Sequence, residues 1–224
     1  LTEPQGGSDL ASIETTAVRD GGEYVLSGEK VFISHANHAS LYFVLATVDR
    51  SLKLKGVCAF LVERDTPGLS TRPLAMHTLK RGDTAQVLLD QVRVPASALL
   101  GGEGNGFRVV GSALDTGRFA VASRAVGQAQ ACVDASLEYA RQRTQFGQEI
   151  GRFQMVQSML ADMIVSVEAA RLLCRRVAQL KEAGVERASY EASMAKLYAA
   201  DVCMKVAEDA VQIHGGYGLT AECA

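Results

Sequence analysis

The spacing of apolar residues changes once along the chain, close to Pro95, and this change limits the possible folds more than any other feature. Before Pro95 the apolar residues form short runs rich in β-branched and aromatic types, which is typical of strands. After Pro95 the sequence has no further proline, alanine becomes frequent, and the apolar spacing lengthens to three and four residues, as in helices. The chain is therefore predicted to be a multidomain α+β protein with two domains, residues 1–100 and residues 101–224.

The first domain is predicted to be an antiparallel β-barrel or β-sandwich of short strands. The Asp20-Gly21 pair favours a tight hairpin, and Pro67, Gly68 and Pro73 mark a longer interruption between strands. The expected strands cover residues 16–18, 24–26, 30–34, 41–48, 57–62 and 85–94.

The second domain is predicted to be an up-down bundle of long helices. Apolar residues at positions i, i+3 and i+4 indicate one buried helical face in its middle part. That face consists of Val156, Met159, Leu160, Met163, Ile164 and Val167. The expected helices cover residues 106–141, 152–182 and 186–213.

Composition and charge exclude several classes of protein. The 23 Lys and Arg residues are balanced by 25 Asp and Glu residues, and a net charge of -2 offers no basic field for nucleic acid. No apolar stretch approaches the roughly 20 residues of a membrane-spanning helix.

His35 and His38 have no obvious companion ligand in the sequence, so no metal site is expected. The cysteines lack any C-x-x-C pair, which argues against zinc and disulfides and favours the cytoplasm, or the mitochondrial matrix of a eukaryote. They are Cys58, Cys132, Cys174, Cys203 and Cys223.

Five short segments carry recognisable motifs: LTEPQGGSD at 1–9, GEKVFIS at 28–34, VRVP at 92–95, RTQFG at 143–147 and QIHGGYG at 212–218. Each motif is weak alone, but their order and spacing resemble the acyl-CoA dehydrogenase family over essentially the whole chain. The resemblance implies the middle β-domain and most of the C-terminal helical bundle of that family, with FAD as cofactor. It also implies that the sequence is a fragment without the N-terminal helical domain of the family.

The resemblance assigns flavin contacts to two segments of the β-domain. Leu1 and Thr2 are expected at the pyrimidine end of the flavin, and Ser8 at the pyrophosphate and the substrate. From the residues alone, this glycine-containing loop could equally be an ordinary capped turn. Phe32 and Ser34 are two apart on an expected strand, so both should face the same flat group, here the isoalloxazine ring. The pair alone is better explained as a core phenylalanine beside a buried serine.

The resemblance also assigns contacts to the helical domain. Asp115 and Arg118 match the L-D-x-x-R segment of the family and are expected on the pantetheine side of the thioester substrate, although their spacing alone suggests a surface ion pair. Four further residues are expected to bind the FAD of a neighbouring subunit, which requires a homodimer or homotetramer. These are Arg143, Phe146, Gln212 and Gly216. His214 is expected to be packed.

The implied reaction is the α,β-dehydrogenation of an acyl-CoA thioester, as in fatty acid metabolism. A base removes the Cα proton, a hydride passes from Cβ to flavin N5, and an electron-transfer flavoprotein takes the electrons. Some family members carry the base immediately before the arginine of L-D-x-x-R, where this sequence has Gly117. Most family members instead carry the base as a glutamate shortly after the Gly-Gly-x-Gly turn. The resemblance therefore implies a base beyond Ala224, and no catalytic residue is assigned within this sequence.

Three alternatives to this function stay open. A flavin monooxygenase or oxidase could use the same scaffold, with oxygen as the electron acceptor. The thioester could be carried by acyl-carrier protein instead of coenzyme A. The chain could also be a non-catalytic fragment that serves as a binding module.

Overall fold

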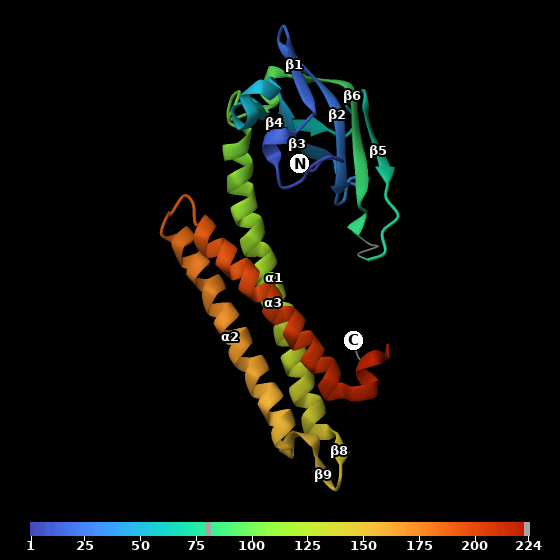
Figure 1. Ribbon diagram of the computed structural model, residues 1–224, viewed down its shortest axis with the longest axis vertical. Helices are drawn as coiled ribbons and strands as arrows, with labels where there is room; N and C mark the ends of the chain where they lie inside the picture. Colours follow the sequence, from blue (N-terminus) through green and yellow to red (C-terminus); the bar gives the residue numbers. More distant parts are fainter. Residues whose placement is uncertain (79–81, 222–224) are drawn as a thin grey trace. The chain divides into compact units, whose positions relative to one another are not determined.

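The computed structural model describes residues 1–78 and 82–221 and divides the chain into two compact units, Leu1–Gly111 and Ser112–Ala224 (Figure 1). The first unit contains a β-sheet, and the second contains long α-helices and a short hairpin. This confirms the predicted α+β class. Each unit has its own hydrophobic core.

The described part of the first unit forms one seven-stranded sheet with the order β5-β6-β2-β1-β3-β4-β7. Its strands are β1 (Thr16–Asp20), β2 (Glu23–Ile33), β3 (Leu41–Thr47), β4 (Val57–Glu63), β5 (Leu69–Pro73), β6 (Ala85–Pro95) and β7 (Leu99–Leu100). The sheet is open, with β5 and β7 at its edges, so of the predicted barrel or sandwich the term barrel applies only loosely. It is also mixed, because β1 pairs with β3 in parallel through Thr16 and Thr47, whereas the other pairs are antiparallel.

The strands β3 and β4 are buried on both faces, which explains their nearly continuous apolar sequence. Alternate residues point to opposite sides of a strand. In β4, Cys58, Phe60 and Val62 belong to the core on one side, and Val57 and Ala59 to a smaller core on the other. The larger core also holds the ring of Tyr24, whose centroid lies 5.1 Å from that of Phe60.

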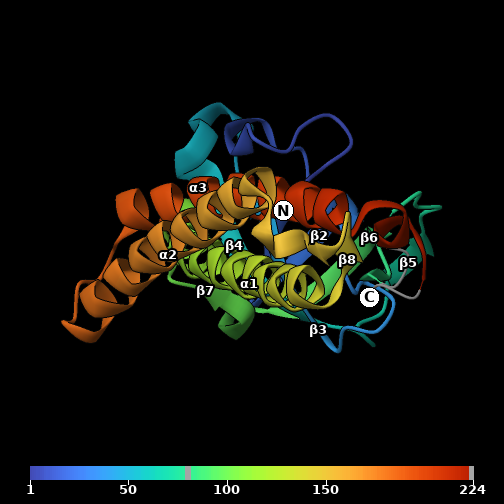
Figure 2. The same ribbon diagram turned by 90° about the horizontal axis from the view of Figure 1, so that it is seen from below.

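Three α-helices are present among the described residues: α1 (Gly106–Gln142), α2 (Gln154–Glu182) and α3 (Ser189–His214). They run side by side in both views of the ribbon (Figure 2), and their ends lie within three residues of the predicted ones. The small antiparallel hairpin of β8 (Thr144–Gln145) and β9 (Gln148–Glu149) follows α1.

The buried face of α2 repeats every three and four residues, as the sequence predicted. Leu160, Met163 and Val167 are buried there, and Val156 and Met159 pack against the same core. The predicted face was too wide in one place, because Ile164 is 40% exposed. The buried residues of α3 are mainly alanine and valine, so a neighbouring helix can pack closely against it.

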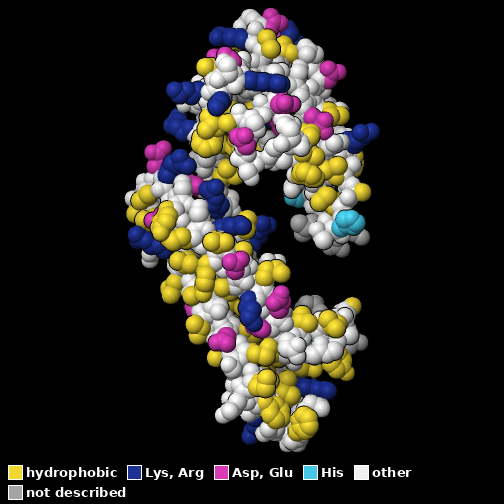
Figure 3. All heavy atoms as spheres, in the orientation of Figure 1, with side chains coloured by type: hydrophobic (Ala, Val, Ile, Leu, Met, Phe, Trp, Pro, Cys, Tyr) yellow, Lys and Arg dark blue, Asp and Glu magenta, His cyan; other side chains and the backbone are white. Residues whose placement is uncertain are grey.

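The surface agrees with the balanced composition. Lys and Arg side chains are interspersed with Asp and Glu side chains on the face shown in Figure 3. No helix within residues 1–78 and 82–221 is long and apolar enough to cross a membrane.

Candidate functional site

Two residues predicted to contact a flavin come together in a small pocket of the first unit. Leu1 and Ser34 both line this space of about 220 Å³, which we call the Ser34 pocket. Its other lining residues are mainly apolar: Lys30, Ile33, Ala39, Leu41, Tyr42, Phe43, Val44 and Val87. A mostly apolar pocket with a few hydroxyl groups suits a flat aromatic group that carries hydrogen-bonding atoms.

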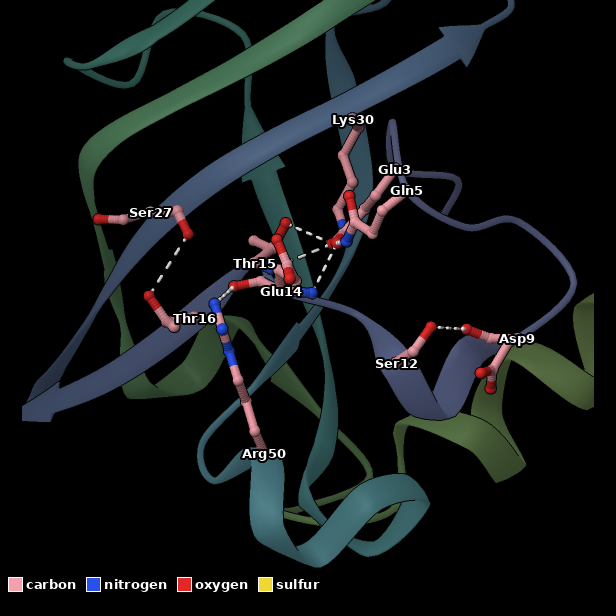
Figure 4. A network of polar contacts seen from close by, with 10 residues as sticks. All are labelled: Glu3, Gln5, Asp9, Ser12, Glu14, Thr15, Thr16, Ser27, Lys30 and Arg50. Atoms are coloured by element: carbon pink, nitrogen blue, oxygen red, sulfur yellow. Dashed lines mark hydrogen bonds and ion pairs between the residues drawn. The ribbon is translucent and has the colours of Figure 1, made fainter.

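The loop that carries Leu1 and Thr2 is held on β2 by main-chain and side-chain contacts. The Val31 N–H donates to the Thr2 carbonyl oxygen at 2.9 Å. Next to this bond, the Lys30 ammonium lies 2.6 Å from the Glu3 carboxylate, and both side chains are almost fully buried (Figure 4). The loop and the strand that lead to the Ser34 pocket are therefore joined by a buried ion pair.

The Glu3 carboxylate accepts several further hydrogen bonds. Its donors include the Thr15 hydroxyl at 2.6 Å, the Thr15 N–H at 3.1 Å and the Glu14 N–H at 2.6 Å. Burial raises the pKa of Glu3, but the hydrogen bonds from Lys30, Thr15 and Glu14 outweigh it and lower the pKa to about 2. The carboxylate is therefore ionised at neutral pH. The sequence analysis missed this pair, although both residues lie within quoted motifs, because nothing local shows that residues 3 and 30 meet.

Phe32 and Ser34 do not share a strand face in the way that their spacing predicted. Ser34 follows the last residue of β2, and the register of β2 against β6 shifts between Lys30 and Ile33. Phe32 itself has a φ of 59°, which is uncommon for a residue with a bulky side chain. The alternative of a core phenylalanine beside a buried serine is wrong as well, because Phe32 is 63% exposed and Ser34 is exposed. Ser8 is also exposed, in the loop that precedes β1.

A second pocket, in the helical unit, brings together two more of the predicted residues. Arg143 and Gly216 line this space of about 410 Å³, which we call the Arg143 pocket. The remaining lining residues are Tyr139, Gln145, Ile150, Ile213, His214, Gly215, Tyr217 and Thr220. A Cβ atom built on Gly216 would meet no atom within 4 Å, so the backbone there is open to a close ligand.

Aromatic side chains shape the Arg143 pocket, and two of them, Tyr139 and Tyr217, were not predicted as site residues. The Arg143 guanidinium lies 5.9 Å from the centroid of the Tyr217 ring. His214 stacks on Tyr139 with centroids 4.5 Å apart, and its Nδ1 lies 2.8 Å from the Ala210 carbonyl oxygen. His214 is thus packed, as expected, but it also lines the pocket. A cation, aromatic faces and an open glycine suit an anionic ligand that carries a ring.

Phe146 and Gln212 lie outside the lining of the Arg143 pocket. Phe146 is 94% exposed at the tip of the β8–β9 hairpin and has a φ of 51°. With Gly147, whose φ is 76°, it forms a two-residue turn in which both residues adopt a positive φ. Gln212 is exposed near the end of α3. In this single chain both side chains are available to a group outside it.

Asp115 is a buried acceptor for three side chains. Arg118 Nη1 lies 2.8 Å and Arg187 Nε 3.5 Å from its carboxylate oxygens, and the Ser189 hydroxyl donates to it. Burial raises the pKa of Asp115, but the Ser189 hydrogen bond and the charges of Arg187 and Arg118 outweigh it and lower the pKa below its ordinary value. The alternative of a plain surface ion pair is wrong, because the Asp115 side chain is only 1% exposed, whereas that of Arg118 is 38% exposed.

Histidine and cysteine side chains are the usual ligands of a structural zinc ion. In the part of the chain that the structure describes, no group of three or more His, Cys, Asp or Glu side chains could hold a metal ion. His38 does have a carboxylate neighbour, Asp83, at 3.9 Å, which the sequence did not reveal. Cys58, Cys132, Cys174 and Cys203 are free thiols, and Cys223 lies outside the described residues.

Comparison with protein families gives two adjacent matches. Residues 1–92 match the model described as the acyl-CoA dehydrogenase middle domain, and residues 104–224 match the acyl-CoA dehydrogenase C-terminal domain. The mitochondrial short-chain specific acyl-CoA dehydrogenase of Bos taurus is 42% identical over 223 residues. That alignment covers 99% of this chain and 54% of the bovine protein.

Three solved structures give the same picture, each with a TM-score of 0.94. Butyryl-CoA dehydrogenase from Megasphaera elsdenii is 38% identical, a prolyl acyl carrier protein oxidase is 36% identical, and a chain in a structure of the electron transferring flavoprotein of Acidaminococcus fermentans is 41% identical. Each match covers 99% of this chain and 58% of the other chain. The chain thus spans little more than half the length of the proteins that it matches.

Proposed function

Because this chain belongs to the acyl-CoA dehydrogenase family, a family of flavoprotein oxidoreductases, we propose that it forms part of an FAD-dependent enzyme that oxidises the Cα–Cβ bond of an acyl-CoA thioester. In this reaction a proton leaves Cα and a hydride leaves Cβ, and a bound FAD would supply the hydride acceptor, N5. We assign no catalytic base to this chain, because the family position before Arg118 is occupied by Gly117.

The observation that carries this proposal is the Ser34 pocket. Ser34 and Leu1 line this mainly apolar space, and the exposed Phe32 lies two residues before Ser34 in the sequence. These residues fit an isoalloxazine ring, which needs apolar contact on its faces and hydrogen bonds at its edge. We propose that Leu1, Thr2, Phe32 and Ser34 hold the flavin ring, and that the hydroxyl of Ser34 donates to its reactive nitrogen. Ser8, exposed in the same loop, would serve the pyrophosphate and the substrate.

The Arg143 pocket supports a second set of cofactor contacts. Arg143 and Gly216 would bind the FAD of a second copy of the chain, with Phe146 and Gln212 extending the contact from the surface. Binding the FAD of a second copy requires at least a homodimer, and a homotetramer would also allow it. The 94% exposure of Phe146 supports this assignment, because a large apolar side chain at the tip of a hairpin gains from being covered.

At the substrate, we propose different roles for the two residues of the L-D-x-x-R segment. Arg118, the more exposed of the two, would contact the pantetheine part of the thioester. Asp115 already accepts from Arg118, Arg187 and Ser189, so its role would be to orient these side chains. We further propose that an electron-transfer flavoprotein takes the electrons. The similarity to a chain in the Acidaminococcus fermentans structure supports this.

The experiment is an anaerobic titration of the purified, FAD-loaded enzyme of which this chain forms part, with a panel of acyl-CoA thioesters. The flavin absorption is expected to bleach with at least one thioester, which also identifies the acyl group. Ser34→Ala and Arg143→Ala are each expected to weaken FAD binding about tenfold, because each removes a hydrogen bond or ion contact of about 1.4 kcal/mol. Ser40→Ala and Arg141→Ala remove exposed side chains nearby and are expected to leave FAD affinity unchanged.

Three results would contradict the proposal. A protein that does not bind FAD would be a non-catalytic member of the family. A bound flavin that never bleaches with any thioester would also argue against dehydrogenation. Rapid reaction of the reduced flavin with oxygen, in place of electron transfer to a flavoprotein, would indicate an oxidase or monooxygenase.

A second candidate substrate class is a thioester carried by acyl-carrier protein. The similarity to a prolyl acyl carrier protein oxidase favours this class. The same titration separates the two, because matched acyl groups can be presented on coenzyme A and on acyl-carrier protein. Faster bleaching with the protein-bound thioester would favour the second candidate.

A further inference from the structure

The turn that carries Ser34 is held in place by a segment far away in sequence. Residues 34–38 form a turn directly after β2, and residues 82 and 83 lie in the segment that leads into β6 at Ala85. The His35 N–H donates to the Gly82 carbonyl oxygen at 3.0 Å. The position of Ser34, at the start of this turn, therefore depends on contacts made by the residues that follow it.

Asp83 makes the side-chain part of this attachment. One carboxylate oxygen accepts the Asn37 N–H at 2.8 Å, and the other accepts the Asn37 side-chain amide at 2.6 Å. The hydrogen bond from the Asn37 side chain lowers the pKa of Asp83, so the carboxylate is ionised and can only accept. His38 Nε2 lies 3.9 Å from the same carboxylate but is 81% exposed, so it is a weaker neighbour.

The turn is also held by two residues outside it, Tyr42 in β3 and Arg64 directly after β4. The Tyr42 hydroxyl donates to the Ala36 carbonyl oxygen at 2.5 Å. Arg64 Nη1 donates to the same carbonyl oxygen and to the Tyr42 hydroxyl, each at 3.2 Å. The turn is thus fixed by Tyr42 and Arg64 as well as by Gly82 and Asp83.

We propose that Asp83 is a positioning residue: by binding Asn37, it holds the turn so that the Ser34 hydroxyl stays in the Ser34 pocket, in place for the flavin. This inference rests on the proposed function. It predicts that removing the Asp83 contacts affects flavin binding through Ser34 alone.

The first test is Asp83→Asn in the FAD-binding protein. The new amide can accept one of the two hydrogen bonds, but its NH2 group then faces a second donor of Asn37. We expect FAD affinity, measured by titration of the apoprotein, to fall about tenfold, with a shift of the bound flavin absorption in the direction that Ser34→Ala causes. Asp90→Asn, an exposed residue on β6, is the matched control and is expected to bind FAD like the wild type.

A double variant separates positioning from a general loss of stability. If Asp83 acts through Ser34, then Asp83→Asn combined with Ser34→Ala will bind FAD no more weakly than Ser34→Ala alone. Exchanging the two side chains, Asn37→Asp with Asp83→Asn, restores both hydrogen bonds at the same net charge. This exchange is expected to return FAD affinity to within about twofold of the wild type. If Asp83→Asn alone does not fold, the exchange variant still tests the role of Asp83.

The outcomes distinguish the two proposals. A wild-type protein that does not bind FAD contradicts the proposed function and the role of Asp83 together. A wild type that binds FAD, with Asp83→Asn lowering only the melting temperature, contradicts the role of Asp83 alone. Two further results contradict the role of Asp83. One is a double variant, Asp83→Asn with Ser34→Ala, in which the losses of FAD affinity add up. The other is an exchange variant that folds but does not recover FAD affinity.

Discussion

The residue pair Glu3 and Lys30 shows how a polar contact can fix a functional loop. Both side chains are almost fully buried, and a buried charge without a partner is costly. The pair lies where the first loop meets β2, directly beside the bond between Val31 and Thr2. Its main effect is therefore on the arrangement of the loop, because the two charges stay paired only while the loop lies against β2.

Lys30→Met is the first prediction at this scale. It leaves the Glu3 carboxylate buried without its cation, and the free energy of unfolding is expected to fall by about 3–5 kcal/mol. Adding Glu3→Gln removes the unpaired charge and should recover part of this loss, which urea unfolding of all the variants will measure. Lys55→Met, at an exposed lysine, is the control and should change stability by less than about 0.5 kcal/mol. Equal effects at the two lysines would contradict the role of the pair.

The same pair predicts a pH dependence. The pKa of Glu3 in the folded protein is about 2, against an ordinary value of 4.5, so the unfolded state takes up the proton first as the pH falls. The stabilisation from Glu3 is therefore complete above pH 4.5 and is lost as the pH falls towards 2. Urea midpoints measured across this range should fall more steeply for the wild type than for Glu3→Gln. Parallel curves for the two proteins would contradict the assignment.

The site residues show what the sequence could and could not predict at this scale. Motifs drew attention to Leu1 and Ser34, which line one pocket, and to Arg143 and Gly216, which line another, and their roles stay predictions. The alternation rule failed at Phe32 and Ser34, because a register shift in β2 breaks the two-residue period. Contacts between distant residues, such as Asp83 with Asn37, leave no local pattern, so the sequence did not predict them.

At the scale of elements, β2 depends on one glycine. Gly28 has a φ of 155° and lies at the other register shift of β2, where Thr15 comes very close. A Cβ atom there would lie 2.5 Å from the Thr15 hydroxyl oxygen and 2.7 Å from the Thr15 Cα. Thr15 in turn donates to Glu3, so this glycine allows the first loop to approach the strand.

Gly28→Ala is accordingly expected to destabilise the first unit by about 1–3 kcal/mol, the usual cost of overpacking. The matched control is Gly22→Ala, where a Cβ atom would meet nothing within 4 Å. The free energy of unfolding of this control should stay within about 1 kcal/mol of the wild-type value. Thermal or urea unfolding of the two variants compares them directly. Similar stabilities for Gly28→Ala and Gly22→Ala would show that Thr15 can move aside at little cost.

Helices were easier to predict than the sheet for a physical reason. A helix is defined by contacts within a few residues, so the period of Leu160, Met163 and Val167 was enough to locate α2. The strand order depends on pairs far apart in sequence. The parallel contact of β1 with β3 and the short strands β5 and β7 have no comparable local pattern. For this reason the sequence predicted a barrel or sandwich of strands but neither the strand order nor the open edges of the sheet.

At the scale of the whole molecule, each hydrophobic core is built from residues of a single compact unit. The helix α1 is the element that belongs to both. Its first residues, including the buried Val110, contribute to a core of the first unit with Ile13 and Leu45. From Phe119 onwards its apolar residues pack in the helical core. We propose that the units are two folding domains joined within one continuous helix.

This proposal predicts that a substitution in one unit changes the stability of that unit and not of the other. Lys30→Met should lower the stability of residues 1–111 alone, because its contacts all lie there. Gly127→Ala should raise the stability of the helical unit by about 0.5–1 kcal/mol, because glycine is unfavourable inside a helix and a Cβ atom there meets nothing within 4 Å. Segment-resolved hydrogen exchange in denaturant reports on both units in one sample. If each variant shifts the exchange of both units equally, α1 couples them into one cooperative structure, and the chain must then be treated as a single folding domain.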